Sequence, residues 1–300
     1  MDNKSHKHSL ALCQEYPFEN HYIEQSYGTN SVARQHYLDE GTGPVILMLH
    51  GNPTWSFYFR NCIHSLKKMG FRCIVPDHMG CGLSDKPRDY PYTLEQRIED
   101  TERLVTSLNI NNFSLLVHDW GGAIGMGLAV RNSEKVERIA ILNSGAYLSN
   151  HMPRRICLLR TPGLGQFLIR GLNLFAWPAT TMSVEVPLSA SVKACYLFPY
   201  GTWAKRIAVW NFVKDIPMKP SDRSYDCLAT IEAKLELLKS KKIGIFWGQK
   251  DFCFNAHFLK RWTEIFPEAK TVVYKDAGHY ILEDAQKEVI PAISEFLVAH

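Results

Sequence analysis

The sequence predicts an α/β fold in which helices cover both faces of a mostly parallel sheet and a helical lobe is inserted between two strands. Two observations carry this prediction. Short apolar runs alternate with amphipathic helical patterns, and this alternation stops between residues 147 and 216 before it resumes. The chain of 300 residues, of which 46% are hydrophobic and 21% charged, is long and apolar enough to bury a large core.

Six runs are predicted as strands of the parallel sheet. Each is short, bounded by turn-forming residues and apolar on both faces, as a strand covered from both sides requires. These runs are Val45–Leu49, Phe71–Val75, Phe113–Val117, Arg138–Leu142, Ile243–Trp247 and Thr271–Tyr274. Ahead of them, His21–Tyr27 and Ala33–Glu40 flank a Gly-Thr-Asn turn and are predicted as an antiparallel hairpin at the sheet edge.

The helical patterns define the domain organisation. The clearest helix is predicted from Thr93 to Leu108, where Thr93 and Gln96 have the spacing of a capping box. We divide the chain into a flexible tail (residues 1–19), an α/β core (residues 20–146 and 217–300) and a helical cap lobe (residues 147–216). The lobe is predicted to lie over the carboxyl ends of the strands, where open α/β sheets bind ligands.

Charge and hydropathy exclude several classes of protein. The net charge of +4 is small and dispersed, which argues against nucleic-acid binding. The first dozen residues lack the apolar stretch of a secretory signal, so a cytoplasmic location is expected. The apolar region from Ile156 to Pro178 is interrupted by charged residues and a proline, which disfavours a membrane span. Packing over a pocket is favoured for this region, and an amphipathic helix resting on anionic lipid is the second interpretation.

The first chemical signal is Asp119 in the segment "LLVHDWGG". A predicted strand ends at Val117 and a helix begins at Gly121, so Asp119 occupies the sharp strand-to-helix turn known as the nucleophile elbow. The usual pattern is GxSxG; this sequence has Val117 at the first glycine position and Asp119 at the serine position. A carboxylate is already ionised at neutral pH, so it needs no base to become a nucleophile.

Two further residues complete a candidate triad. Asp251 follows the strand Ile243–Trp247, and His279 follows the strand Thr271–Tyr274. The chain order nucleophile, acid, histidine is that of the α/β hydrolase fold. Because each residue lies just past the end of a strand, the three are expected to meet at one edge of the sheet. Asp119 would form an ester, and His279, oriented by Asp251, would activate water against that ester in a hydrolytic cycle.

Donors for a departing anion are predicted next to Asp119. Asn52 lies at the tip of the strand Val45–Leu49 in "HGNPTW", and Trp120 supplies an indole N–H beside the nucleophile. The backbone N–H groups of both residues would form an oxyanion hole. The lobe also carries six aromatic residues that are candidates for lining an apolar tunnel, with core packing favoured for at least half of them: Phe167, Phe175, Trp177, Trp203, Trp210 and Phe212.

Five segments resemble the haloalkane dehalogenase branch of the α/β hydrolases, and the likeness extends from about residue 20 onward. They are "HGNPTWSFYFR", "VPDHMGCGLSDKP", "VHDWGG", "WGQKDFCF" and "GHYILEDA". In that branch the acid follows one of two strands; here the earlier site reads Asn143-Ser144 without a carboxylate, so the acid is assigned to Asp251. The resemblance implies no metal and no cofactor.

Within this branch the segments "TWAKRIAVWNFVKDIPMKPSD" and "KDFCFNAHFLKRW" resemble the β-lactone decarboxylases of long-chain olefin biosynthesis. The resemblance implies a carbon-carbon lyase that converts cis-3,4-dialkyl β-lactones to cis-alkenes and carbon dioxide. It also implies an assembly with the lactone-forming enzyme, with a peripheral membrane contact as an expectation. The residues do not distinguish attack on the ring carbonyl from attack on the ring carbon that bears oxygen.

Two alternative functions are carried alongside this one. The first is a haloalkane dehalogenase, which would use the same residues to hydrolyse a carbon–halogen bond to an alcohol and a halide. The second is a catalytically silent hydrolase fold that serves as a receptor or scaffold. Such a protein need not keep a triad, whereas Asp119, Asp251 and His279 are all present here.

Overall fold

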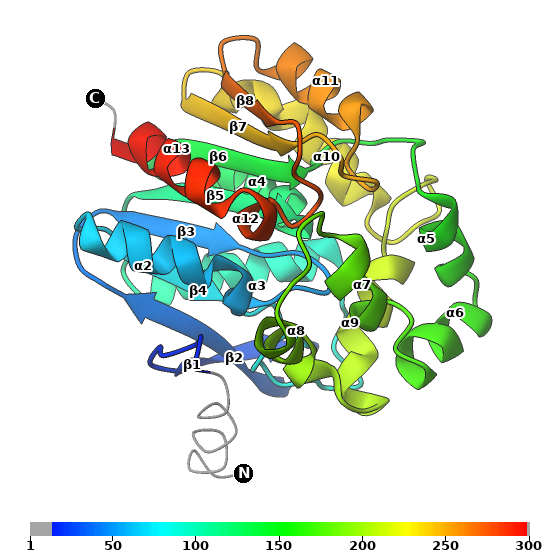
Figure 1. Cartoon of the computed structure of the whole chain (residues 1–300). Helices are drawn as coiled ribbons and strands as arrows, with labels where there is room; N and C mark the ends of the chain where they lie inside the picture. The colour runs from blue at the N-terminus through cyan, green and yellow to red at the C-terminus, as the bar shows by residue number, and fades with distance from the viewer. Residues whose placement is uncertain (1–13, 299–300) are drawn as a thin grey trace.

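The computed structural model describes residues 14–298, which form an eight-stranded sheet between two layers of helices, with a helical lobe at one end (Figure 1). The strands run in the order β1-β2-β4-β3-β5-β6-β7-β8. The first two strands are antiparallel to their neighbours, and the pairs from β3 onward are parallel. The bounds are β1 (His21–Tyr27), β2 (Ser31–Glu40), β3 (Val45–Leu49), β4 (Arg72–Pro76), β5 (Phe113–Asp119), β6 (Val136–Ser144), β7 (Lys242–Gly248) and β8 (Lys270–Tyr274).

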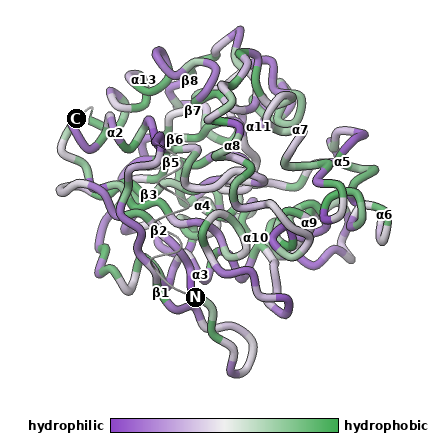
Figure 2. Tube along the Cα trace, turned by 60° about the horizontal axis from the view of Figure 1, so that its bottom comes forward, coloured by the Kyte–Doolittle hydropathy of each residue, from purple (hydrophilic) through white to green (hydrophobic). Residues whose placement is uncertain are grey.

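The helices of the core form two layers, and both pack on alternate side chains of the strands. In β3, Leu47 and Leu49 face one apolar core while Ile46 and Met48 face the other, which explains why the run is apolar throughout. One layer contains α3 (Leu94–Ser107), α4 (Trp120–Arg131), α10 (Tyr225–Lys234) and α11 (Ala256–Ile265). The other contains α2 (Arg60–Lys68), α12 (Ile281–Asp284) and α13 (Gln286–Val298). Figure 2 shows the hydrophobic stretches concentrated in the interior of this arrangement.

The predicted α/β class, the strand positions and the helix after residue 93 agree with the structure. The cap on α3 is only half of a capping box. The Thr93 hydroxyl accepts a hydrogen bond from the Gln96 N–H, but the Gln96 side chain donates to Asp100 at 3.1 Å and does not reach back to residue 93. Asp100 lies one turn farther along the helix and competes successfully for that amide.

The inserted lobe lies over the carboxyl ends of the strands (Figure 1). It consists of short helices. The apolar region Ile156–Pro178 therefore does not form the single amphipathic helix that the second interpretation expected. Pro162, together with Gly163 at φ +74°, ends the first helix, and Asn173 at φ +56° interrupts the chain again. The helices are α5 (Arg154–Leu159), α6 (Leu164–Gln166), a π-helical turn (Phe167–Gly171), α7 (Ala176–Met182), α8 (Ala190–Leu197) and α9 (Ile207–Lys214).

The predicted flexible tail is too long at its inner end. Residues 1–13 lie outside the described part of the chain, but Tyr16 is buried. Its ring lies 4.8 Å from that of Trp55, its hydroxyl is hydrogen-bonded to Ser56, and Phe18 packs against the same core. These partners are distant in sequence, so a short polar-looking segment gave no periodic signal of its burial.

Candidate active site

Asp119 lies at a backbone turn that the local sequence makes feasible. The residue has φ +52° and ψ −126°, a conformation that an L-residue adopts only when its surroundings enforce it. A Cβ at Gly121 would lie 1.9 Å from the Leu49 carbonyl oxygen, and one at Gly122 would lie 1.7 Å from the Ser144 hydroxyl. The two glycines after Trp120 are therefore required for α4 to start against β3 and β6.

The missing first glycine of the elbow is replaced by a glycine farther along the chain. A Cβ at Gly125 would lie 2.6 Å from a methyl carbon of Val117. The open space that a glycine would provide on the strand is thus provided by the facing turn of α4. This explains why Val117 is compatible with the elbow.

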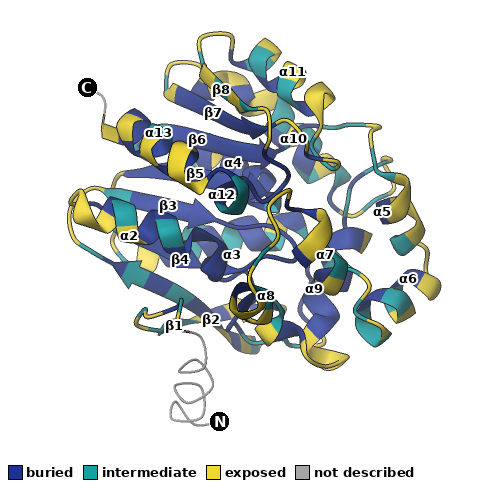
Figure 3. Cartoon of the chain, viewed as in Figure 1, coloured by how far each residue is buried: buried dark blue, intermediate teal, exposed yellow. Residues whose placement is uncertain are grey.

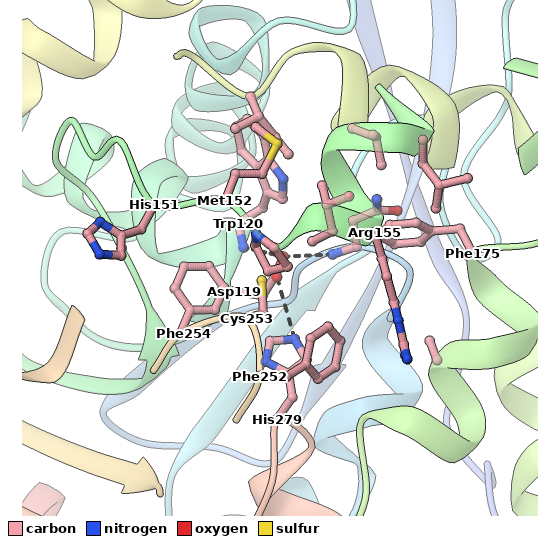
Figure 4. A pocket seen from close by; sticks show the side chains of 18 of the residues that line it. Asp119, Trp120, His151, Met152, Arg155, Phe175, Phe252, Cys253, Phe254 and His279 are labelled. Atoms are coloured by element: carbon pink, nitrogen blue, oxygen red, sulfur yellow. Dashed lines mark hydrogen bonds and ion pairs between the residues drawn. The ribbon is translucent and has the colours of Figure 1, made fainter. Parts of the chain in front are cut away.

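The carboxylate of Asp119 is oriented by two backbone donors. The N–H groups of Asn52 and Trp120 both donate to Oδ1, the former at 2.9 Å. The other oxygen, Oδ2, lies 3.5 Å from Nε2 of His279 (Figure 4). Burial raises the pKa of the Asp119 carboxyl, but the hydrogen bond and charge of His279 outweigh burial and lower the pKa overall. Asp119 is thus ionised, with one oxygen held and the other facing the imidazole.

Asp251 holds the histidine from its other side. Oδ2 of Asp251 lies 2.7 Å from Nδ1 of His279, and Oδ1 accepts the backbone N–H groups of Cys253 and Phe254 at 2.6 and 3.0 Å. The structure therefore brings together the three residues that the chain order predicted. The alternative position for the acid, at the end of β6, holds no carboxylate. There the Asn143 amide donates to and accepts from the backbone of Gly248, which links β6 to β7.

His118 is a neighbour that the sequence interpretation missed. Its Nε2 donates to the backbone carbonyl of His279 at 2.9 Å, and its ring lies 4.6 Å from the His279 ring. Burial, followed by the positive charge of His279, lowers the pKa of His118 to about 3, so this imidazole stays neutral. It ties the loop after β8 to the strand that carries the nucleophile. In the sequence, only its position immediately before Asp119 could have pointed to this role.

The two predicted side-chain donors differ in their hydrogen bonds: the Trp120 indole N–H donates to no residue between 14 and 298, and the Asn52 amide donates one of its two hydrogens. The Trp120 indole is half-buried and lines the cavity. The Asn52 amide nitrogen donates one hydrogen to the carbonyl of Val209 in α9 at 3.2 Å, which leaves its second hydrogen. The cap therefore helps to place the Asn52 side chain, a contact that strand-end reasoning did not anticipate.

The cavity above Asp119 is large and mostly apolar. Its volume is about 480 Å³, and it lies between the core and α5 and α7 of the cap. Figure 4 shows the Asp119 carboxylate facing the His279 ring, with Phe252, Cys253 and Phe254 close by. Other residues that line the cavity are Met152, Ile156, Leu159, Leu168, Leu174, Phe175, Pro178, Val213, Ile216 and Leu228. Such a site suits an apolar substrate with one reactive polar centre.

Only one of the six candidate tunnel aromatics, Phe175, lines this cavity. Trp210 and Phe212 are buried, so core packing holds for two of the six residues and not for at least half of them. The remaining three are exposed on the cap surface, an outcome that neither interpretation anticipated: Phe167, Trp177 and Trp203.

Behind the wall of the cavity lies Arg97, a second residue that the sequence did not single out. Its guanidinium carbon lies 3.7 Å from the Phe212 ring centroid and 5.8 Å from that of Trp120. It is buried and pairs with Asp215 at the end of α9 at 3.5 Å. The ion pair joins the cap to α3 of the core directly behind the leaving-group donor.

The position of His279 between two carboxylates predicts a pH-dependent stability. Burial lowers the pKa of His279, but Asp251 and Asp119 outweigh it and raise the pKa to about 10. The unfolded histidine titrates at about 6.5, so the folded state binds the extra proton between these values. The stabilisation is fully present below about pH 6.5 and is lost as the pH rises to about 10.

Asp119→Asn removes one of the two carboxylates and should lower the pH at which this loss is complete. The measurement is the urea midpoint of both proteins as a function of pH, with Asp276→Asn at an exposed carboxylate as the control. A wild-type protein that loses no more stability than Asp119→Asn on going to alkaline pH would contradict the assignment.

The comparisons with known proteins agree with this geometry. The family model described as "alpha/beta hydrolase fold" matches residues 44–182. A cis-3-alkyl-4-alkyloxetan-2-one decarboxylase from Shewanella oneidensis is 44% identical over 94% of this chain and 89% of its own length, and one from Xanthomonas campestris is 39% identical over 87% and 91%. A haloalkane dehalogenase from Mycobacterium bovis is 32% identical over 94% and 96%. The solved haloalkane dehalogenase of Bradyrhizobium elkani superimposes with a TM-score of 0.80 at 23% identity, over 94% of this chain and all of that one.

The sheet topology, the elbow and the three side chains at its edge define an enzyme with the α/β hydrolase fold. The chain belongs to the α/β hydrolase family, in the group that contains these decarboxylases and the haloalkane dehalogenases. Within residues 14–298, no helix is long and apolar enough to cross a bilayer. In the same range, no group of three or more His, Cys, Asp or Glu side chains is placed to hold a metal ion.

Proposed function

We propose that this chain converts cis-3,4-dialkyl β-lactones to cis-alkenes and carbon dioxide, with Asp119 as the nucleophile. The similarity over nearly the whole chain to two cis-3-alkyl-4-alkyloxetan-2-one decarboxylases, at 44% and 39% identity, carries the proposal. The apolar cavity above Asp119 supports it, because a dialkyl lactone has one polar ring between two hydrocarbon chains. The cytoplasmic location and the assembly with a lactone-forming enzyme stay predictions.

The geometry of Asp119 suggests a balanced sequence of steps. Oδ1 stays in the hole formed by the Asn52 and Trp120 N–H groups, and Oδ2 attacks the ring carbon that bears oxygen. The ring C–O bond breaks, an Asp119 ester forms, and the former ring carboxyl leaves as a carboxylate. Loss of carbon dioxide then passes the C–C electron pair into the new double bond and expels Asp119 as a carboxylate. No water is consumed.

This route accounts for the geometry of the product. Attack on the ring carbon inverts it, and departure of carbon dioxide anti to the ester leaves the two alkyl groups on the same side of the alkene. The charge released in the first step falls beside Trp120, the second hydrogen of the Asn52 amide and the protonated His279. Donors and a cation in an apolar cavity stabilise such charge more strongly than water does.

The decisive experiment supplies the purified protein with a synthetic cis-β-lactone and, separately, with a bromoalkane. Alkene and carbon dioxide from the lactone, with little bromide from the second reaction, are expected. Rapid bromide and alcohol release without alkene would instead establish the dehalogenase alternative, for which the 32% identical relative provides the specific observation.

Trp120→Phe tests the leaving-group site. The change keeps the aromatic packing against Phe212 and removes the indole N–H, so kcat on the lactone should fall by about 10²–10³-fold, roughly 2–4 kcal/mol. Trp203→Phe, at an exposed tryptophan of the cap, is the matched control. A kcat for Trp120→Phe equal to that of the control would refute the donor role.

A further inference from the structure

The surface of the cap around the cavity carries an unusual set of exposed apolar side chains. Trp177 is 60% exposed, Phe167 54% and Leu158 55%. They belong to α7, the π-helical turn and α5, and Figure 3 shows exposed segments on both α5 and α7. Other members of this surface, which we call the cap face, are Leu164, Leu172, Leu174, Met182 and Trp203. Isolated apolar side chains on a surface need no explanation, but such a group indicates an interaction site.

The cap face is continuous with the mouth of the cavity. Leu158, Leu174 and Met182 are each more than a third exposed and also line the cavity above Asp119. Phe252, 41% exposed, completes this rim from the core side. The route into the cavity therefore opens within an apolar surface.

The charges on the cap face have one sign. The sequence contains no aspartate or glutamate between Glu137 and Glu185, whereas the same stretch includes Arg154, Arg155 and Arg170 in the cap. Arg154 and Arg155 are exposed at the start of α5, and Arg155 lines the cavity. Arg170 lies with its guanidinium 4.7 Å from the Trp203 ring centroid. Two carboxylates beyond this stretch are paired with other cations: Asp222 with Arg160, and Glu185 with Lys250.

We propose that the cap face docks on an anionic lipid surface, with the cavity mouth turned toward the lipid. Exposed tryptophan and phenylalanine suit the boundary between headgroups and acyl chains, and arginines complement the negative surface potential of anionic lipids. This charge complementarity favours lipid over a second copy of the chain, because two copies would bring arginines of the same sign together. In its account of substrate delivery the inference rests on the proposed function: a dialkyl lactone and an alkene would dissolve in the bilayer and enter or leave through the mouth.

The test is cosedimentation of the full chain with phosphatidylcholine vesicles, with and without phosphatidylglycerol. Binding is expected only to the anionic vesicles and should weaken at high salt. Phe167→Ser with Trp177→Ser, and separately Arg154→Glu, should each lower the partition coefficient about tenfold. None of these three residues lines the cavity. The matched controls are Leu237→Ser with Val298→Ser, and Lys68→Glu, which change residues that are also exposed but belong to the α/β core.

Several outcomes overturn the docking proposal. One is absence of wild-type binding to anionic vesicles, and another is equal loss of binding in the cap and control variants. If the protein self-associates without lipid, and Phe167→Ser with Trp177→Ser abolishes that self-association, the cap face belongs to a contact with a second copy.

A short-chain lactone dispersed in buffer separates the docking proposal from the proposed function. The cap variants should turn it over at the wild-type rate. A protein that binds vesicles but turns over no lactone would refute the proposed function alone.

Discussion

Asp119→Ala is expected to reduce alkene formation from a cis-β-lactone by at least about 10⁴-fold, as removal of a nucleophile does in other enzymes. The substitution removes the oxygen that faces His279 and the one held by Asn52 and Trp120. Circular dichroism and the urea midpoint establish that the variant is folded. Asp276→Ala, at an exposed aspartate on the loop before His279, serves as the matched control and should keep its rate.

The same substitution separates catalysis from mere binding. A catalytically silent receptor would retain its ligand in the cavity and show no dependence of any turnover on residue 119. If Asp119→Ala left product formation unchanged while the lactone still bound, the scaffold alternative would replace the enzymatic one. The complete set of partners around Asp119 and Asp251 argues against that outcome, because each oxygen of both carboxylates faces a donor.

His279→Ala is expected to slow alkene formation by about 10³-fold or more, because it removes a cation beside the reacting carboxylates in an apolar cavity. The measurement is single-turnover release of alkene by the variant and the wild type. His257→Ala, at an exposed histidine of α11, is the control. A near-wild-type rate for His279→Ala would show that the imidazole takes no part in the reaction.

A bromoalkane distinguishes the two tasks that His279 can perform. Hydrolysis of an Asp119 ester requires the imidazole to activate water, so the His279→Ala variant should accumulate that ester, detectable by mass spectrometry of the peptide that contains residue 119. Decarboxylation of the lactone consumes no water and regenerates Asp119, so no stable adduct is expected with the lactone. Accumulation of a stable lactone adduct would contradict the proposed order of steps.

The predicted positions of the strands and of the triad agree with the structure because both depend on local patterns. The strands β5 and β7 are buried on both faces and are apolar over most of their length, and Asp119 and Asp251 lie at the ends of these runs. His279 follows β8, an edge strand whose residues are exposed or half-buried, so only its short run of strand-forming residues predicted it. The parallel pairing of β5 through β8 then brings the ends of these strands to one edge. No long-range information was needed beyond the direction of the strands.

The residues that the sequence interpretation missed depend on contacts between distant segments. His118 meets the backbone of residue 279, the Asn52 amide meets Val209, and Arg97 meets Asp215. None of these pairs has a characteristic spacing, so no motif predicts them. The cap differed most from expectation, because Pro162 and Gly163 divide its apolar stretch and leave several aromatic side chains on the surface.

The reciprocal packing of Val117 and Gly125 has a consequence for how such enzymes diverge. A Cβ at residue 125 would lie 2.6 Å from a methyl carbon of Val117 and 3.3 Å from one of Leu49, so we expect a side chain on the helix to fit only when the strand residue opposite it is small. We expect Gly125→Ala alone to displace the nucleophile turn, and the same replacement combined with Val117→Gly to remove the closest contact and leave only the one with Leu49 at 3.3 Å. Sequence searches that demand glycine at the first elbow position will overlook chains that satisfy this steric requirement eight residues downstream.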